Sequence, residues 1–218
     1  MLYRRDLSIL RITNERDANP HIHRLEIRMN KNRLEAFSDG VIAIIITIMV
    51  LEIKVPHGET ISALIPLIPV IMSYVLSFIY IGIYWNNHHH FMHMVHHIDG
   101  RVLWANLHLL FWLSLVPFAT GWIGENHIAP LPVAVYGFIL LMAGVAYGIL
   151  TKIVLNVKDQ NPQLAQAVGS GIKEKLSVLI YLIAIPIAFI NQWISLVLYV
   201  LVAIMWLQPD RRIEKLLD

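Results

Sequence analysis

The sequence contains no cysteine among its 218 residues, and charged residues make up only 15% of it. Without cysteine the chain has no disulfide bond, thiolate nucleophile or cysteine-ligated metal. The formal net charge of +2 is too small to indicate nucleic-acid binding. Glycine-rich phosphate loops, nucleophile elbows and paired catalytic carboxylates are also missing from the sequence, so no familiar enzyme motif is present.

Apolar residues take the place of the missing charges. They make up 57% of the chain, and the mean hydropathy is +0.61, whereas about 45–50% of a soluble domain is apolar. Residues 102–124 and 176–207 contain no charged side chain. A soluble domain could not bury so much apolar surface. The lipid bilayer is therefore the expected solvent of an all-α, multi-pass membrane protein.

Apolar runs predict where the helices cross the membrane. Runs of about 20 residues span about 30 Å of hydrocarbon, and four such runs occur at 36–53, 61–85, 102–123 and 131–151. Residues 176–207 are too many for one span, and Asn191-Gln192 form a polar turn near their middle. We therefore predict two short helices there and six transmembrane helices in all. The prolines within the runs, such as Pro117, are expected to kink their helices.

The distribution of basic residues predicts the orientation. With six spans, Lys54 is the only one of the 17 Lys and Arg residues that lies on the outer side. Basic residues concentrate on the cytoplasmic side of membrane proteins, so both termini are expected to be cytoplasmic. The predicted organisation is a polar cytoplasmic tail at 1–32, a six-helix transmembrane domain at 33–207 and a second cytoplasmic tail at 208–218.

The first predicted helix has two different faces. Ser38 and Asp39 lie near its cytoplasmic end, and a charged residue inside a span must face protein or water because lipid does not solvate it. Ile44, Thr47 and Leu51 follow a helical spacing on another face. Around an axis between subunits these three would form apolar rings with one layer of hydroxyl oxygens. The same spacing also occurs in ordinary packing faces.

Two sequence patterns together resemble the potassium channel family of transmembrane protein 175. The first opens an apolar helix and consists of Arg33, three further residues and then Phe37-Ser38-Asp39. The second consists of Trp85 followed by His88-His89 near the end of the second span. Six spans agree with that family. No Thr-Val-Gly-Tyr-Gly segment, the carbonyl filter of other potassium channels, occurs in this sequence.

The resemblance implies a function and roles for particular residues. The first helix would line a potassium-conducting pore, with Ile44 as a water-excluding constriction, Thr47 as the hydroxyl layer that contributes to selectivity, and Leu51 as a second apolar ring. A buried hydrogen-bond network would hold this helix. Its expected members are Arg33, Phe37, Ser38, Asp39, Trp85, His88 and His89.

The resemblance also implies an assembly and a location. One helix stripe cannot enclose a pore, and Phe-Ser-Asp occurs only once in the chain, so a symmetric oligomer is required. The resemblance implies a homotetramer in a prokaryotic plasma membrane. Potassium would be the permeating ion, with no cofactor, no chemical reaction and no nucleic acid.

Histidines crowd the end of the second predicted span. If the helix continued, His89, His93 and His97 would share one face at the spacing of a zinc site. A pH sensor and a hydrogen-bonded helix end, with His88 or His89 reaching Asp39, are the other interpretations. No metal is expected at these histidines.

Two further features concern helix packing. The partner of His108 is expected on another helix, because Asn106 does not share its face. Gly144 and Gly148 form a Gly-x-x-x-Gly pair, which permits close helix approach.

Two rival functions remain to be weighed. A proton- or cation-coupled secondary transporter needs membrane-embedded charges around a central site, and only Asp39 and Glu52 are available. A metal-dependent membrane enzyme would have to use the histidine cluster, which lacks the Glu of a His-Glu-x-x-His motif. The channel is the favoured function.

Overall fold

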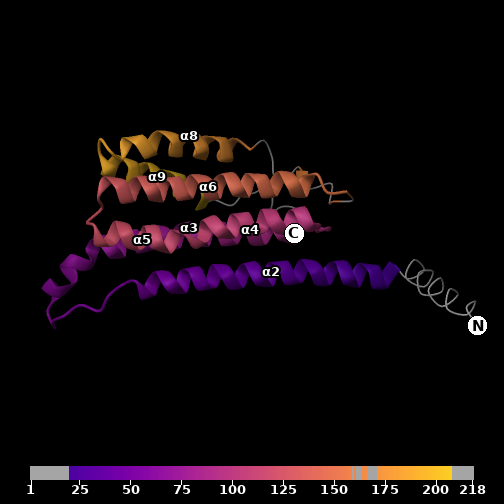
Figure 1. The fold of residues 1–218 in the computed structure, drawn as a ribbon, viewed down its shortest axis with the longest axis horizontal. Helices are drawn as coiled ribbons and strands as arrows, with labels where there is room; N and C mark the ends of the chain where they lie inside the picture. Colours follow the sequence, from indigo (N-terminus) through magenta and orange to yellow (C-terminus); the bar gives the residue numbers. More distant parts are fainter. Residues whose placement is uncertain (1–19, 159, 161–163, 166–170, 208–218) are drawn as a thin grey trace, which may run out of the picture.

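The computed structural model describes residues 20–158, 160, 164, 165 and 171–207, and all regular elements in this part of the chain are helices. The helices run side by side along one direction (Figure 1). In lipid, a helix satisfies its own backbone hydrogen bonds, which suits an apolar sequence. The elements are α2 (Pro20–Leu51), η1 (Ile61–Leu67), α3 (Ile68–Met94), α4 (Gly100–Ser114), α5 (Val116–Glu125), α6 (Pro130–Leu155), α8 (Ile172–Ile187) and α9 (Gln192–Leu207).

The structure confirms the predicted all-α membrane fold. Among the described residues, four helical segments are long and apolar enough to cross a membrane, namely Lys31–Leu51, Ile61–Met94, Gly100–Glu125 and Pro130–Leu155. The last apolar stretch forms two helices of 16 residues each, α8 and α9. The turn between them lies where Asn191 was expected to interrupt the stretch, so that prediction is correct.

The predicted tails lie largely outside the described residues. Residues 1–19 of the first tail and all of the second tail, 208–218, lie outside the described residues. The backbone is already helical from Pro20, so α2 begins 13 residues before the predicted boundary at 32/33, within the predicted tail.

The α3 helix is longer than predicted. It continues to Met94, nine residues past the predicted end at 85, and residues 95–99 then connect it to α4. Asp99 caps α4, because its carboxylate accepts hydrogen bonds from the backbone N–H groups of Arg101 at 2.9 Å and Val102 at 3.0 Å. The hydrogen bond from the Arg101 side chain, together with these backbone bonds, lowers the pKa of the Asp99 carboxyl.

The third predicted span is interrupted at Leu115, which separates α4 from α5. Pro117 stands in the first turn of α5, where its missing N–H costs no hydrogen bond. The backbone N–H of Ala119 donates to the carbonyl of Leu115 at 3.2 Å, so the helical bonding resumes at once. The interruption lies two residues before Pro117, the residue at which the sequence predicts a kink.

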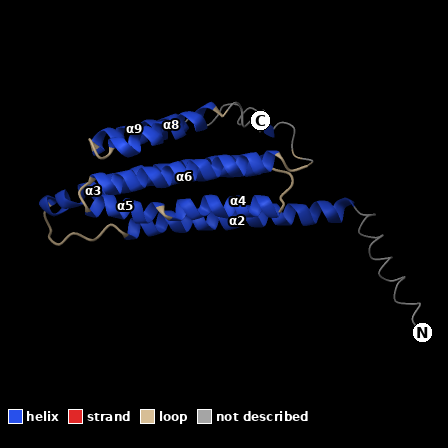
Figure 2. Cartoon of the chain, turned by 45° about the horizontal axis from the view of Figure 1, so that its top comes forward, coloured by secondary structure: helices blue, strands red, loops and turns tan. Residues whose placement is uncertain are grey.

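The α6 helix lies in the middle of the bundle. It packs against α4 and α5 on one side and against α8 and α9 on the other (Figure 2). The α2 helix packs against α3, α4 and α5 and lies at the opposite edge of the molecule from α8 (Figures 1 and 2). One face of α2 is therefore left without a neighbour among the residues that the structure describes.

Close approach of helices occurs at other glycines than the expected pair. A Cβ on Gly148 would meet nothing within 4 Å, and one on Gly144 would lie 3.7 Å from the Tyr84 hydroxyl oxygen. A Cβ on Gly137 of α6 would instead overlap the phenol of Tyr199, and one on Gly124 would lie 2.8 Å from Val70 Cα. Gly137 and Gly124, rather than the Gly-x-x-x-Gly pair, allow the tight contacts.

Candidate pore-lining helix and its hydrogen-bond network

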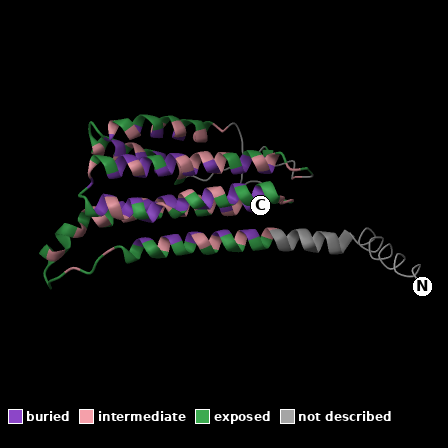
Figure 3. Cartoon of the chain, viewed as in Figure 1, coloured by how far each residue is buried: buried purple, intermediate pink, exposed green. Residues whose placement is uncertain are grey.

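The two faces of α2 differ sharply in burial. Leu34, Ser38, Ile42, Ile45 and Met49 recur at helical spacing and are all buried. The opposite side of α2, turned away from the other helices, is exposed along the described length of the helix (Figure 3). The buried face binds α2 to its own subunit, and the exposed face is apolar surface that a soluble monomer would not carry.

The predicted stripe lies on this exposed face. The side chains of Ile44 and Leu51 are 59% and 75% exposed, whereas the adjacent Ile45 is 3% exposed. Thr47 is exposed between them, and its hydroxyl donates to the Ala43 carbonyl at 2.9 Å. The hydroxyl proton is thus held by the helix, so the oxygen lone pairs remain free to accept a hydrogen bond or a cation.

Ser38 joins α2 to α4 and α3 through a buried amide. Its hydroxyl donates to the Leu34 carbonyl at 2.9 Å and accepts from Asn106 Nδ2 at 2.9 Å. Asn106 Oδ1 lies 2.8 Å from His88 Nε2. Since Asn106 donates to Ser38 through its nitrogen, its oxygen must accept, which assigns a proton to His88 Nε2. All three side chains are buried.

Asp39 makes a second, separate contact with α3. Trp85 Nε1 donates to Asp39 Oδ1 at 3.0 Å. The imidazole of His89 stacks on the Trp85 ring with centroids 5.8 Å apart and an angle of 23°. Of the predicted network residues, the structure therefore joins Asp39, Trp85 and His89 in one group and Ser38 and His88 in another, the latter through Asn106.

Arg33 and Phe37 lie on the exposed side of α2. No hydrogen bond or ion pair joins the Arg33 side chain to any residue in the described part of the chain. The neighbouring Lys31 makes the contact with α3 instead, since its ammonium donates to the His93 carbonyl at 2.8 Å. Arg33 and Phe37 thus belong to the surface that carries the stripe.

The histidine cluster does not form the predicted face. The rings of His89 and His93 lie 4.9 Å apart between centroids, but α3 ends at Met94, so His97 lies in the connection to α4. Within the described ranges, no group of three or more His, Asp or Glu side chains is placed to hold a metal ion. The i, i+4, i+8 face of His89, His93 and His97 is wrong because the helix stops.

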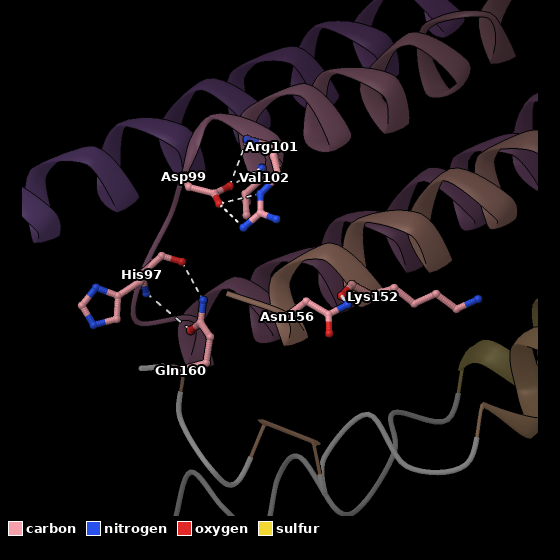
Figure 4. A network of polar contacts seen from close by, with 7 residues as sticks. All are labelled: His97, Asp99, Arg101, Val102, Lys152, Asn156 and Gln160. Carbon is pink, nitrogen blue, oxygen red and sulfur yellow. Dashed lines mark hydrogen bonds and ion pairs between the residues drawn. The ribbon is translucent and has the colours of Figure 1, made fainter. Parts of the chain in front are cut away.

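Gln160 fixes the backbone of the histidine connection (Figure 4). Its Oε1 accepts from the His96 N–H at 2.9 Å, and its Nε2 donates to the His97 carbonyl at 2.6 Å. These bonds tie the connection between α3 and α4 to the segment that follows α6. Sequence reasoning did not identify Gln160, because nothing in its neighbourhood distinguishes it from a surface residue.

The partner of His108 was predicted on the wrong helix. Trp112 Nε1, one turn further along α4, donates to His108 Nε2 at 3.0 Å. The spacing i, i+4 brings the two rings together on one face. The prediction considered Asn106 as a partner within the helix and overlooked the indole.

The end of α2 opposite the histidines carries an exposed ion pair. Lys54 Nζ and Glu125 Oε1 lie 2.5 Å apart, which links the residues after α2 to the end of α5. The carboxylate raises the pKa of Lys54 above its usual value. A Cβ on Gly121 would lie 3.7 Å from the Glu52 carboxylate, so Glu52 turns toward α5.

Asn106 is the residue of this site that sequence reasoning missed. It is fully buried within an otherwise apolar helix, where an amide needs partners. Replacement of Asn106 by Leu should leave Ser38 and His88 each without one partner and destabilise the protein by roughly 1–3 kcal/mol per orphaned group. Thermal denaturation in detergent measures this loss.

The control for this prediction is a second substitution. Ser38→Ala in the Asn106→Leu background removes one of the two orphaned groups, so the double variant should be more stable than the sum of the single variants implies. Simple additivity of the two losses would contradict the direct bond between Asn106 and Ser38.

Comparison with known proteins identifies the family. A family model described as the endosomal/lysosomal potassium channel TMEM175 matches residues 33–117, which include α2 from Arg33 onward, α3, α4 and the beginning of α5. A potassium channel of a Chryseobacterium species is 53% identical over 187 residues, which cover 86% of this chain and 97% of that protein. A potassium channel of Chamaesiphon minutus is 34% identical over 175 residues, 75% of this chain and 86% of that one.

A solved structure agrees with these sequence relatives. The crystal structure of a lysosomal potassium-selective channel TMEM175 homolog from Chamaesiphon minutus superimposes with a TM-score of 0.69 at 30% identity, over 82% of this chain and 96% of that one. The resemblance inferred from the Phe-Ser-Asp and Trp-His patterns is thereby confirmed. This multi-pass membrane protein belongs to the TMEM175 potassium channel family.

Proposed function

We propose that the chain is one subunit of a homotetrameric potassium channel, with the exposed face of α2 from each subunit turned toward a central pore. The relatives from Chryseobacterium and Chamaesiphon minutus are potassium channels by name. Conduction follows the electrochemical gradient, with potassium as the permeating ion, no cofactor and no chemical reaction. The channel lies in a prokaryotic plasma membrane with both termini cytoplasmic, the orientation that the basic residues favour.

The observation that carries the proposal is the uncovered stripe on α2. Ile44, Thr47 and Leu51 are exposed, whereas Ile42, Ile45 and Met49 on the other face of α2 are buried, so the subunit leaves this stripe for contact with something outside itself. Lipid alone would not require a hydroxyl within the stripe. In a ring of four such helices, Ile44, Thr47 and Leu51 would all face the central axis.

The stripe also suits ion selection. Rings of Ile44 and Leu51 make apolar constrictions that exclude loosely held water, and a constriction of this kind gates by dewetting. Thr47 lies between them with its proton committed to Ala43, so its oxygen can take the place of a water molecule on a partly dehydrated cation. In this arrangement Ile44 sets the narrowest point and Thr47 assists selection.

Reconstitution into liposomes with a potassium gradient tests this function. A channel gives a persistent potassium flux that follows the gradient, like the flux that the ionophore valinomycin produces. The flux through a channel does not saturate as uptake by a transporter does. Uptake that saturates and requires a proton gradient would indicate a transporter instead. If protein that elutes as an oligomer gives no flux above that of empty liposomes, the proposal is overturned.

The chain has no native cysteine, so single cysteines can report which face of α2 meets its own copies. Ile44→Cys is expected to form disulfide-linked dimers under mild oxidation, because equivalent positions approach one another at a shared axis. Ile45→Cys is the matched control, since this neighbouring isoleucine is buried in its own subunit. Non-reducing electrophoresis reads the result, and equal cross-linking of both variants would contradict the predicted axis.

A further inference from the structure

An unpaired carboxylate lies at the outer end of α2, directly after the stripe on this helix. Glu52 follows Leu51, the last residue of α2, and is exposed. Its carboxylate turns toward α5, since a Cβ on Gly121 would lie 3.7 Å from it. No hydrogen bond or ion pair joins this carboxylate to any residue in the described part of the chain. A partner there therefore does not neutralise the charge of Glu52.

The basic residue closest to Glu52 in the sequence is already paired. Lys54 Nζ lies 2.5 Å from Glu125 Oε1, and two opposite charges so close together largely cancel at a distance. On the outer side, the connections after α2 and after α5 carry three glutamates, Glu52, Glu59 and Glu125, and one lysine, Lys54. Carboxylates thus outnumber ammonium groups there, whereas all the other Lys and Arg residues lie on the cytoplasmic side of the six-span arrangement.

The place of Glu52 brings its charge close to an ion that enters the proposed pore. A helix with its side chains is about 10–12 Å wide, so a residue at the end of a helix that lines the axis stands within about one helix width of that ion. The Debye length is about 10 Å at 0.1 M salt and about 30 Å at 0.01 M. At low salt the ion therefore experiences the charge of Glu52 with little screening.

We propose that the Glu52 carboxylates of the four subunits form a ring that concentrates potassium ions at the outer mouth of the pore and so raises the rate of their entry. A negative potential raises the local concentration of cations, and carboxylate rings serve cation channels in this way. Glu52 acts through its charge and not as a direct ligand, because its carboxylate turns toward α5. This inference rests on the proposed tetrameric channel.

Single-channel currents in planar lipid bilayers test the ring, with the potassium concentration held constant and the ionic strength set by a salt of a bulky cation. Glu52→Gln should lower the current of potassium entering from the outer mouth about three- to tenfold at about 0.01 M ionic strength, as four unit charges about 10 Å from an ion in water imply. At about 1 M, where the Debye length is about 3 Å, the variant should conduct like the original protein. Measurement at about pH 8 keeps protonated histidines from adding positive charge.

The outcomes separate this inference from the proposed function. If the original protein conducts and Glu52→Gln conducts equally at low ionic strength, the ring is refuted and the channel stands. A loss of current of the same size at both ionic strengths would show a structural role and would also refute the ring. If the assembled original protein carries no potassium current, the proposed function itself fails, and the ring fails with it.

Further variants separate charge from side-chain shape. Glu52→Asp keeps the charge and should restore most of the current that Glu52→Gln loses. Glu174→Gln is the matched control, because Glu174 belongs to α8, at the opposite edge of the molecule from α2 (Figure 1), and its loss should leave the current unchanged at both ionic strengths.

A variant of the opposite sign covers the case in which Glu52→Gln fails to fold. Lys54→Gln removes the positive charge of an exposed ion pair, and such a pair contributes little to stability. The variant leaves Glu125 unpaired and should raise the outer-mouth current roughly twofold at low ionic strength. A current that falls in correctly assembled Lys54→Gln would contradict an electrostatic role for the outer charges.

Discussion

Replacing Ile44 by Asn is expected to raise potassium flux and to lower the preference for potassium over sodium. The amide would hold water in the constriction, so an ion would keep more of its hydration shell there. A barrier lowered by about 0.7–1.4 kcal/mol increases the flux roughly three- to tenfold. Liposome flux measured with potassium and then with sodium gives both quantities.

Val50→Asn is the matched control for this prediction. Val50 is also an exposed aliphatic residue of α2, at 44% exposure, but it lies about a third of a turn around the helix from Ile44 at 3.6 residues per turn. It should leave the flux and the selectivity unchanged. If Ile44→Asn conducts like the original protein when correctly assembled, Ile44 is not the constriction.

Replacing Gly137 by Ala is expected to be severely destabilising. The added methyl group would overlap the phenol of Tyr199, which is fully buried and whose hydroxyl donates to the Val133 carbonyl. Overpacking of this kind costs about 1–3 kcal/mol, and at about 2–4 °C per kcal/mol in a chain of this size the melting temperature should fall by about 2–12 °C. Thermal denaturation in detergent, followed by tryptophan fluorescence, measures the shift.

Gly148→Ala on the same helix is the control. Nothing lies within 4 Å of a Cβ at this position, and alanine favours a helix over glycine by roughly 1 kcal/mol, so this variant should be as stable as the original protein or more stable. Adding Tyr199→Phe to Gly137→Ala removes the overlapping oxygen and should restore part of the stability. A neutral Gly137→Ala would show that α6 and α9 do not pack as closely as described.

Features that depend on a single segment could be predicted from the sequence. The turn at Asn191 follows from the chemistry of the residues themselves and occurs where expected, and the helix is interrupted at Leu115, close to the kink that Pro117 predicts. The stripe of Ile44, Thr47 and Leu51 follows from helical spacing, and the structure places it on the exposed side of α2. In each case the signal lies within one helix and needs no knowledge of its neighbours.

Features that depend on contacts between helices could not be predicted. Asn106 was examined only as a partner for His108 in its own helix, whereas it bonds to Ser38 of α2 and His88 of α3. Tight packing was expected at Gly144, but the close ring belongs to Tyr199, 62 positions after Gly137. Which side chain of a distant segment faces a given residue depends on how the helices are rotated, and hydrophobic spacing does not specify that rotation closely enough.

The end of α3 was misjudged for a different reason. Hydropathy falls where the histidines begin, so the predicted span stopped at 85, but the helix itself continues to Met94. The membrane boundary and the end of a helix need not coincide, because the first depends on side-chain polarity and the second on helix capping. His97 was predicted to lie on a face of this helix, but the helix ends at Met94, before His97.

The length of α2 has a mechanical consequence. Its 32 residues make a rod of about 48 Å at 1.5 Å per residue, while the hydrocarbon layer is only about 30 Å thick. Because the apolar part lies toward Leu51, roughly 18 Å of the rod must stand out in water at its Pro20 end. A rotation of that projecting end about the helix axis would turn Ile44 with it, so the proposed pore-lining residues are mechanically coupled to the aqueous end of α2.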